Sequence, residues 1–356
     1  MMPNLATPDG WLPLAFLAVM GLSILLYVVL DGFDLGIGIL MPWANAEEKD
    51  QMVAAIGPFW DANETWLVLG IGVLSVAFPA AHGEILRALY LPTALMLTGL
   101  ILRGVAFDLR VKAALHQRHW WNRAFFFGSL LAALAQGYML GMMVMGYASD
   151  IKAQAFAVLI AICVTAAYVL LGAGWLIIKT QADLQAKAVR WAAYGWKGAL
   201  LGFMAISAAT PLLSAEIQAR WFALERLPWL APLPLITGVL FWLIQRRLGQ
   251  MQRGERRESR TPFAASAGIF VLAFAGLVYS LFPWLIPGKL DIWQAAAAPE
   301  SLMIVFIGTC LVLPVILGYS FFAYRIFRGK AALLDYGIER APLLEAAPAP
   351  RQADEH

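Results

Sequence analysis

Residues 12–41, LPLAFLAVMGLSILLYVVLDGFDLGIGILM, form an apolar stretch that is long enough to cross a lipid bilayer as a helix. A helix rises about 1.5 Å per residue and the hydrocarbon core is about 30 Å thick, so about 20 such residues suffice. Residues 1–11 contain no Lys or Arg, whereas a cleavable signal peptide needs a basic start. We therefore interpret the stretch as a retained transmembrane helix. Its second half is unusual because it contains Asp31 and Asp34.

Similar apolar stretches recur along the whole chain of 356 residues, of which 61% are hydrophobic and only 14% are charged. This composition excludes a soluble globular domain of the same size. We predict an all-α, polytopic membrane protein with a single transmembrane domain over residues 1–330 and a disordered tail over 331–356. The predicted transmembrane helices, nine in number, cover residues 12–41, 59–79, 85–108, 124–147, 154–179, 196–215, 229–248, 264–286 and 302–325.

The distribution of basic residues predicts the orientation of these helices. If the N-terminus is periplasmic, most of the 26 Lys and Arg residues fall in cytoplasmic loops or in the tail. Basic loops are typical of the cytoplasmic side of a membrane protein. We therefore predict a periplasmic N-terminus and a cytoplasmic C-terminus, and the basic stretch 249–260 is expected to contact anionic lipid headgroups.

Acidic residues occur in or at the ends of the first three predicted helices, where a charge costs about 2.5–3.5 kcal/mol at the helix centre. These acids are Asp31, Asp34, Asp61, Glu64 and Asp108, and Arg103 is the only basic residue deep in a predicted helix. The predicted orientation places all five acids in the cytoplasmic half of the membrane. A spacing of three residues puts Asp31 with Asp34, and Asp61 with Glu64, on one helix face.

Closely spaced carboxyl groups in a medium of low dielectric cannot all be ionised, so they share protons. Such a group suits a proton relay, in which Arg103 would hold one carboxylate ionised while others stay protonated. The alternative is purely structural, because buried acids also pair with bases, cap helix ends or line an interface. The residues alone leave both interpretations open.

Redox chemistry requires ligands that this chain does not place in its predicted helices. Its four histidines, His82, His116, His119 and His356, all fall in predicted loops or in the tail, and no dinucleotide, phosphate or zinc motif is visible. Cys163 and Cys310 lie inside apolar stretches, which argues against a disulfide. We therefore expect no redox centre and no metal in this chain.

Two further patterns predict helix packing. Gln136 is an isolated polar residue in the middle of a predicted helix, which favours an interhelical hydrogen bond. Glycines surround the acids, and small side chains let helices approach closely. The glycines in question are Gly32, Gly36, Gly38, Gly70, Gly72, Gly99 and Gly104.

Taken together, seven stretches that span nearly the whole chain in order resemble subunit II of the cytochrome bd-type quinol oxidases, and are closest to the cyanide-insensitive branch. The stretches are LDGFDLGIGIL (30–40), GPFWDANETWLV (57–68), LRGVAFDLR (102–110), AQGYMLG (135–141), LLGAGWLIIKTQADLQ (170–185), FPWLIPGKLDIWQAAAAPESL (282–302) and LPVILGYSFFAYRIFRGK (313–330).

This resemblance implies nine transmembrane helices, arranged as two four-helix bundles plus one extra helix, in the inner membrane of a bacterium. It implies an obligate partner, subunit I, which holds two b-type haems, haem d and the quinol site, and in some complexes a small single-helix subunit. The complex would oxidise ubiquinol or menaquinol and reduce O2 to water with cytoplasmic protons, without pumping. Some family members also hold a structural quinone in subunit II.

The resemblance also implies a role for the acids, as part of a cytoplasmic proton path toward haem d. The family's acids fall on Asp31, Asp34, Asp61 and Asp108, whereas Glu64 stands where other members carry a different residue. A stand-alone proton-coupled transporter is the alternative function, since it explains the acids equally well, although no paired helix breaks of the kind common in transporters are visible. A membrane scaffold would leave the acids unexplained.

Overall fold

The computed structural model describes residues 4–331 except positions 115, 214, 224 and 257. The described residues are all-α apart from one short antiparallel hairpin, which confirms the predicted all-α class. The predicted tail lies outside the described residues apart from Ala331. The elements are α1 (Pro8–Leu40), η1 (Met41–Trp43), α2 (Ala46–Ile56), α3 (Trp60–Ala77), α4 (Pro79–Ala88), α5 (Tyr90–Lys112), α6 (Arg118–Val144), α7 (Ile151–Lys179), α8 (Ala182–Leu213), α9 (Ala215–Trp221), α10 (Leu227–Leu230), α11 (Pro232–Gln252), α12 (Thr261–Leu281), β1 (Trp284–Ile286), β2 (Leu290–Asp291), α13 (Ile292–Ala295) and α14 (Pro299–Ile326).

Within the described part of the chain, seven helices are long and apolar enough to cross a membrane, and an eighth span results if α3 and α4 count as one. These two helices meet at an angle of 119°. Pro79 opens α4, where a proline is tolerated because the first turn needs no backbone N–H donor. Each of the nine predicted stretches overlaps a helix, but the count of nine crossings and the division into two four-helix bundles stay predictions.

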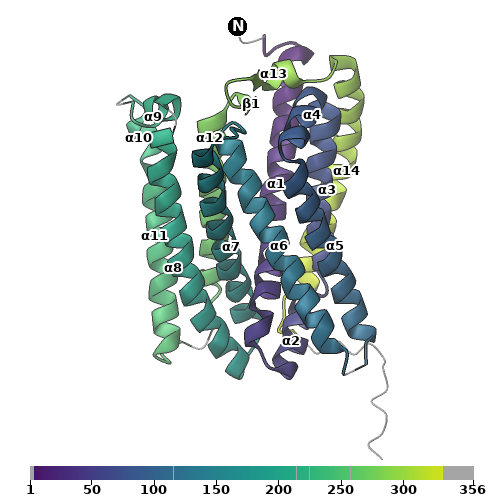
Figure 1. The fold of residues 1–356 in the computed structure, drawn as a ribbon, viewed down its shortest axis with the longest axis vertical. Helices are drawn as coiled ribbons and strands as arrows, with labels where there is room; N and C mark the ends of the chain where they lie inside the picture. Colours follow the sequence, from purple (N-terminus) through teal and green to yellow (C-terminus); the bar gives the residue numbers. More distant parts are fainter. Residues whose placement is uncertain (1–3, 115, 214, 224, 257, 332–356) are drawn as a thin grey trace, which may run out of the picture.

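Helix α1 runs along most of the molecule and packs against α3, α6, α7, α12 and α14 (Figure 1). The start of α1 lies at the upper end of the view, close to α13, and α2 lies at the lower end. On the predicted orientation, the lower end is cytoplasmic. The pairs α5 with α6, α7 with α8 and α11 with α12 are extensive contacts between helices that follow one another along the chain.

Glycines allow two of these contacts to bring backbones together. A Cβ atom added to Gly36 would overlap the Tyr168 carbonyl group, and one added to Gly172 would lie 2.6 Å from the Ile37 nitrogen, so α1 and α7 touch directly. A Cβ atom on Gly99 would lie 2.7 Å from the Gly128 oxygen, where α5 meets α6. Close packing is thus confirmed for these contacts.

The other predicted glycines differ among themselves. Gly32 and Gly38 have no room for a Cβ atom, because Tyr168 and Ser129 respectively occupy that space. By contrast, nothing lies within 4 Å of a Cβ atom on Gly72, so the packing prediction was wrong there.

The short helix α2 fixes the lower end of the molecule. Asn45 and Glu48 form a capping box, in which each side chain accepts a hydrogen bond from the backbone N–H of the other. Lys187 on α8 also donates to Glu48, over 2.7 Å. Burial tends to raise the pKa of Glu48, but the hydrogen bonds from Lys187 and Asn45 outweigh it and lower the pKa below its ordinary value of 4.5.

Candidate functional site

The lower half of α1 carries two fully buried acids. The side chains of Asp31 and Asp34 are both 0% exposed, although each belongs to an otherwise apolar helix. The close approach of α7 at Gly36 covers one side of α1, and α3 and α5 bring polar groups to the acids. A buried carboxylate without a partner is costly, so these polar groups determine what the site can do.

Arg103 on α5 connects two acids from two other helices. Its guanidinium group donates to Asp31 Oδ1 over 2.6 Å and to Glu64 Oε2 over 2.9 Å. The Arg103 side chain is 1% exposed, whereas that of Glu64 on α3 is 27% exposed. The ionic group therefore reaches from the buried interior of α1 to the surface at Glu64. Arg103 was predicted to hold a carboxylate, and the structure identifies Asp31 and Glu64 as its partners.

Asp34 is held by a second chain of hydrogen bonds. The Asn63 amide donates to Asp34 Oδ2 over 2.8 Å and to the Leu30 carbonyl oxygen over 3.2 Å. The Tyr324 hydroxyl on α14 in turn donates to Asn63 Oδ1 over 2.8 Å. The Tyr324 ring stacks on Phe59 with 4.5 Å between centroids, which holds the hydroxyl in place.

A third set of polar groups lies one helical turn before Asp31. Gln136 on α6 donates to the Tyr27 hydroxyl over 2.6 Å and accepts from the Tyr168 hydroxyl over 2.7 Å. The predicted interhelical hydrogen bond of Gln136 is thus confirmed. Because Tyr27 precedes Asp31 by four residues, both face the same side of α1. Polar groups therefore continue from Asp31 toward the middle of the molecule.

Each buried acid keeps one oxygen without a hydrogen-bond partner among the described residues. These atoms are Asp31 Oδ2 and Asp34 Oδ1, and the Nε atom of Arg103 is also without a partner there. An unpaired buried oxygen can accept a proton or a water molecule without breaking the bonds made to Arg103 or Asn63. Each of the two acids therefore keeps one oxygen atom at which a further hydrogen bond can form.

Asp61 and Asp108 stand apart from this buried group. Both are exposed on the surface of the chain, Asp61 one turn before Glu64 on α3 and Asp108 in the last turns of α5. The structure thus brings together Asp31, Asp34, Glu64 and Arg103, and it leaves the other two predicted acids at the surface. The predicted proton role of all five acids stays a prediction.

Several polar partners of the acids were not predicted from the sequence. Tyr27, Tyr168 and Tyr324 were not singled out, although the spacing of four between Tyr27 and Asp31 was a usable signal. A further ion pair joins Asp50 on α2 to Arg110 on α5 over 2.6 Å. It was missed because loop charges were used only to predict orientation.

A ligand set for a metal or haem iron is not found among the described residues. They contain no group of three or more His, Cys, Asp or Glu side chains placed to hold a metal ion. His116 and His119 are exposed and His82 is partly exposed on α4, so the described histidines offer no buried ligand for a haem iron. His356 lies outside the described residues.

Comparison with known proteins gives consistent matches over most of the chain. The profile of a family described as cytochrome bd terminal oxidase subunit II matches residues 12–327. The cytochrome bd ubiquinol oxidase subunit 2 of Bacillus subtilis is 25% identical over 327 residues, which cover 86% of this chain and 93% of that protein. The cytochrome bd-I ubiquinol oxidase subunit 2 of Escherichia coli K12 is 24% identical over 368 residues, with 90% and 95% covered.

A solved structure shares the fold. A chain in the structure of the bd oxidase from Geobacillus thermodenitrificans superposes with a TM-score of 0.73 at 16% sequence identity. The match covers 89% of this chain and 98% of that chain.

Proposed function

The chain belongs to the cytochrome bd terminal oxidase subunit II family, as a multi-pass membrane protein of a bacterial bd oxidase, and we propose that it conducts protons from the cytoplasm toward the oxygen-reducing site of its partner subunit. In this proposal the partner, subunit I, holds the two b-type haems and haem d, and it oxidises quinol. This chain supports assembly and supplies part of the proton path. Each O2 that is reduced to two waters consumes four electrons and four protons, so a path for protons is a chemical requirement.

One observation carries the proposal, namely that Arg103, which keeps its own proton, bonds to the carboxyl groups of both Glu64 and Asp31 and so holds them close together. Glu64 is partly open to the surface and Asp31 is fully buried, and Arg103 bonds to both. Charged side chains in a membrane interior are costly, so a set that leads inward from the surface is expected to serve ion transfer. Asp61, exposed one turn before Glu64, would collect protons at the entrance, and Asp108 would do so at the end of α5.

The free oxygens of the two buried acids support the same function. A relay residue must accept a proton and release it without dismantling its surroundings. Asp31 Oδ2 and Asp34 Oδ1 meet this requirement, because neither takes part in the bonds that hold the two side chains. The hydrogen bonds among Tyr27, Gln136 and Tyr168 would extend the path inward from Asp31.

The test is to replace Asp61 by asparagine in the assembled oxidase. We expect lower quinol oxidase turnover, because the entrance loses its titratable group, with a haem content close to that of the unaltered complex. Asp9→Asn is the matched control. Asp9 is also exposed, but it lies in the first turn of α1, far along that helix from the buried acids Asp31 and Asp34. Unchanged turnover in a fully assembled Asp61→Asn complex would show that Asp61 takes no part in proton uptake. Loss of haem would instead assign Asp61 to subunit contact.

The same preparation separates this function from that of a stand-alone transporter. Purification in mild detergent is expected to yield the chain together with a haem-bearing subunit of similar size. Isolation as an intact, haem-free protein from membranes that contain both subunits would contradict the proposal.

A further inference from the structure

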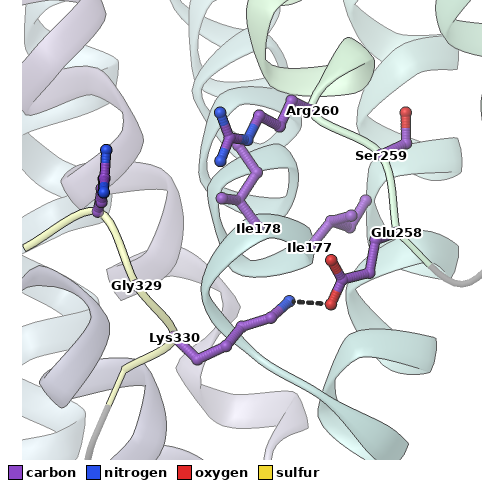
Figure 2. Close-up of a pocket in the computed structure, with 8 residues that line it drawn as sticks. Ile177, Ile178, Glu258, Ser259, Arg260, Gly329 and Lys330 are labelled. Atoms are coloured by element: carbon purple, nitrogen blue, oxygen red, sulfur yellow. Dashed lines mark ion pairs between the residues drawn. The ribbon is translucent and has the colours of Figure 1, made fainter.

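A pocket of about 220 Å³ opens at the lower end of the molecule, where the end of α7, the start of α12 and the segment after α14 meet (Figure 2). Ile177 and Ile178 come from the last turn of α7, and Arg260 precedes the first residue of α12. Arg328 and Lys330 come from the segment that follows α14. The site is separate from the buried acids and does not depend on the proton path.

The segment after α14 is fixed against α7, so the pocket has a defined wall. Lys179 donates to the carbonyl oxygens of Phe327 and Gly329, the latter over 3.1 Å. The Ala331 N–H donates to the Lys179 carbonyl oxygen over 2.9 Å. These bonds tie the end of α14 to the end of α7 from both sides of Arg328.

The charges that line the pocket do not cancel. Lys330 pairs with Glu258 over 2.9 Å, as Figure 2 shows, and also donates to the Thr180 carbonyl oxygen over 3.1 Å. Arg260 also acts on Glu258, because Lys330 first and Arg260 as a weaker contributor lower the pKa of that carboxyl group. One carboxylate against three basic side chains still leaves an excess of positive charge in the pocket, and the positive N-terminal end of α12 adds to the attraction for an anion.

The position of the pocket determines which anion fits. Its walls include the apolar side chains at the end of one candidate span, and its arginines lie at the ends of two others. An apolar wall beside a basic rim, at the level where membrane helices end, matches a molecule with a phosphate next to an apolar chain. We propose that the pocket binds the phosphate of an anionic phospholipid, held by Arg260 and Arg328, with the glycerol region against Ile178.

The experiment is a titration of the purified, delipidated complex with phosphatidylglycerol, with bound lipid counted by native mass spectrometry. Phosphatidylcholine is the zwitterionic comparison, and inorganic phosphate is the competitor. The test variant is R260Q with R328Q. The control is R256Q, which removes one charge from the same loop but does not line the pocket.

We expect phosphatidylglycerol to bind in preference to phosphatidylcholine. A basic residue near an anionic membrane surface contributes about fivefold in affinity. The affinity of the double variant for phosphatidylglycerol should therefore fall about 30-fold, and that of R256Q far less. If the double variant unfolds, R260K with R328K keeps the charge and should keep most of the preference. Equal losses in the control and the double variant, or no preference for phosphatidylglycerol, would overturn the site. Full displacement by inorganic phosphate at the same concentration would overturn the lipid assignment.

Discussion

Replacing Arg103 by methionine is expected to destabilise the protein by about 3–5 kcal/mol. Arg103 is 1% exposed and its partner Asp31 is 0% exposed, so neither can turn toward water when the other is removed. The variant leaves a buried carboxylate unpaired, and this accounts for most of the cost. Glu64 is 27% exposed and can be hydrated, so the loss of its ion pair adds little.

The second variant in this test combines Arg103→Met with Asp31→Asn. Removing both charges of a buried pair costs much less than removing one, so the double variant should be more stable than Arg103→Met alone. The matched control is Arg87→Met. Its ion pair with Glu84 is 3.4 Å long and both side chains are largely exposed, so we expect a change below about 1 kcal/mol.

The measurement is the free energy of unfolding in mixed micelles, taken from a titration with a denaturing detergent and followed by tryptophan fluorescence. A cost below about 1 kcal/mol for Arg103→Met would refute the reasoning, because it would show that the charge of Asp31 is not held by Arg103. Costs of the two substitutions that simply add in the double variant would likewise contradict a direct pairing of Arg103 with Asp31.

Three other substitutions test separate parts of the structure. Gly36→Ala should lower the melting temperature of the complex, because its Cβ atom would overlap the Tyr168 carbonyl group and overpacking costs about 1–3 kcal/mol. Tyr324→Phe keeps the ring but loses a hydrogen bond, so unfolding should show a loss of about 1 kcal/mol with normal assembly. The hydrogen bonds from Lys187 and Asn45 lower the pKa of Glu48 in the folded protein. The ionised Glu48 side chain therefore stabilises the fold fully above pH 4.5, and this stabilisation is lost as the pH falls through the folded pKa. The stability difference between the unaltered protein and Glu48→Gln should therefore be constant from pH 7 to 5 and shrink below pH 4.5, and a difference that grows on acidification would contradict this.

Apolar length was enough to predict an all-α membrane protein, and acid spacing placed Asp31 and Asp34 on one helix face, because both follow from local sequence. The partner of each charge was not predictable, since Arg103 lies 72 positions from Asp31 and their contact depends on how α5 packs. The exposure of Asp61 and Asp108 was missed for a related reason. Spacing predicts which residues share a helix face but not which face the neighbouring helices cover.

The bend between α3 and α4 was likewise not predicted. Hydropathy is continuous through Phe78 and Pro79, and the predicted stretch 59–79 simply ended there. The proline was a signal for a helix start, but the 119° angle depends on packing against the hairpin and α13, which hydropathy does not describe.

The hydrogen bond from Tyr324 has a consequence for the two oxygen atoms of Asp34. The Tyr324 hydroxyl donates to Asn63 Oδ1, while the Leu30 carbonyl oxygen, which can only accept, keeps the Asn63 NH2 group on the side of Asp34, where it donates to Oδ2. Only Oδ1 of Asp34 is then left to receive a proton. A tyrosine on α14, a helix with little buried surface of its own, thus helps to fix which oxygen of an acid on an inner helix has no hydrogen-bond partner among the described residues. Rotation of the Asn63 amide would turn its carbonyl oxygen toward Asp34 in place of its NH2 group. The amide would then stabilise the protonated form of Asp34 and no longer the ionised form.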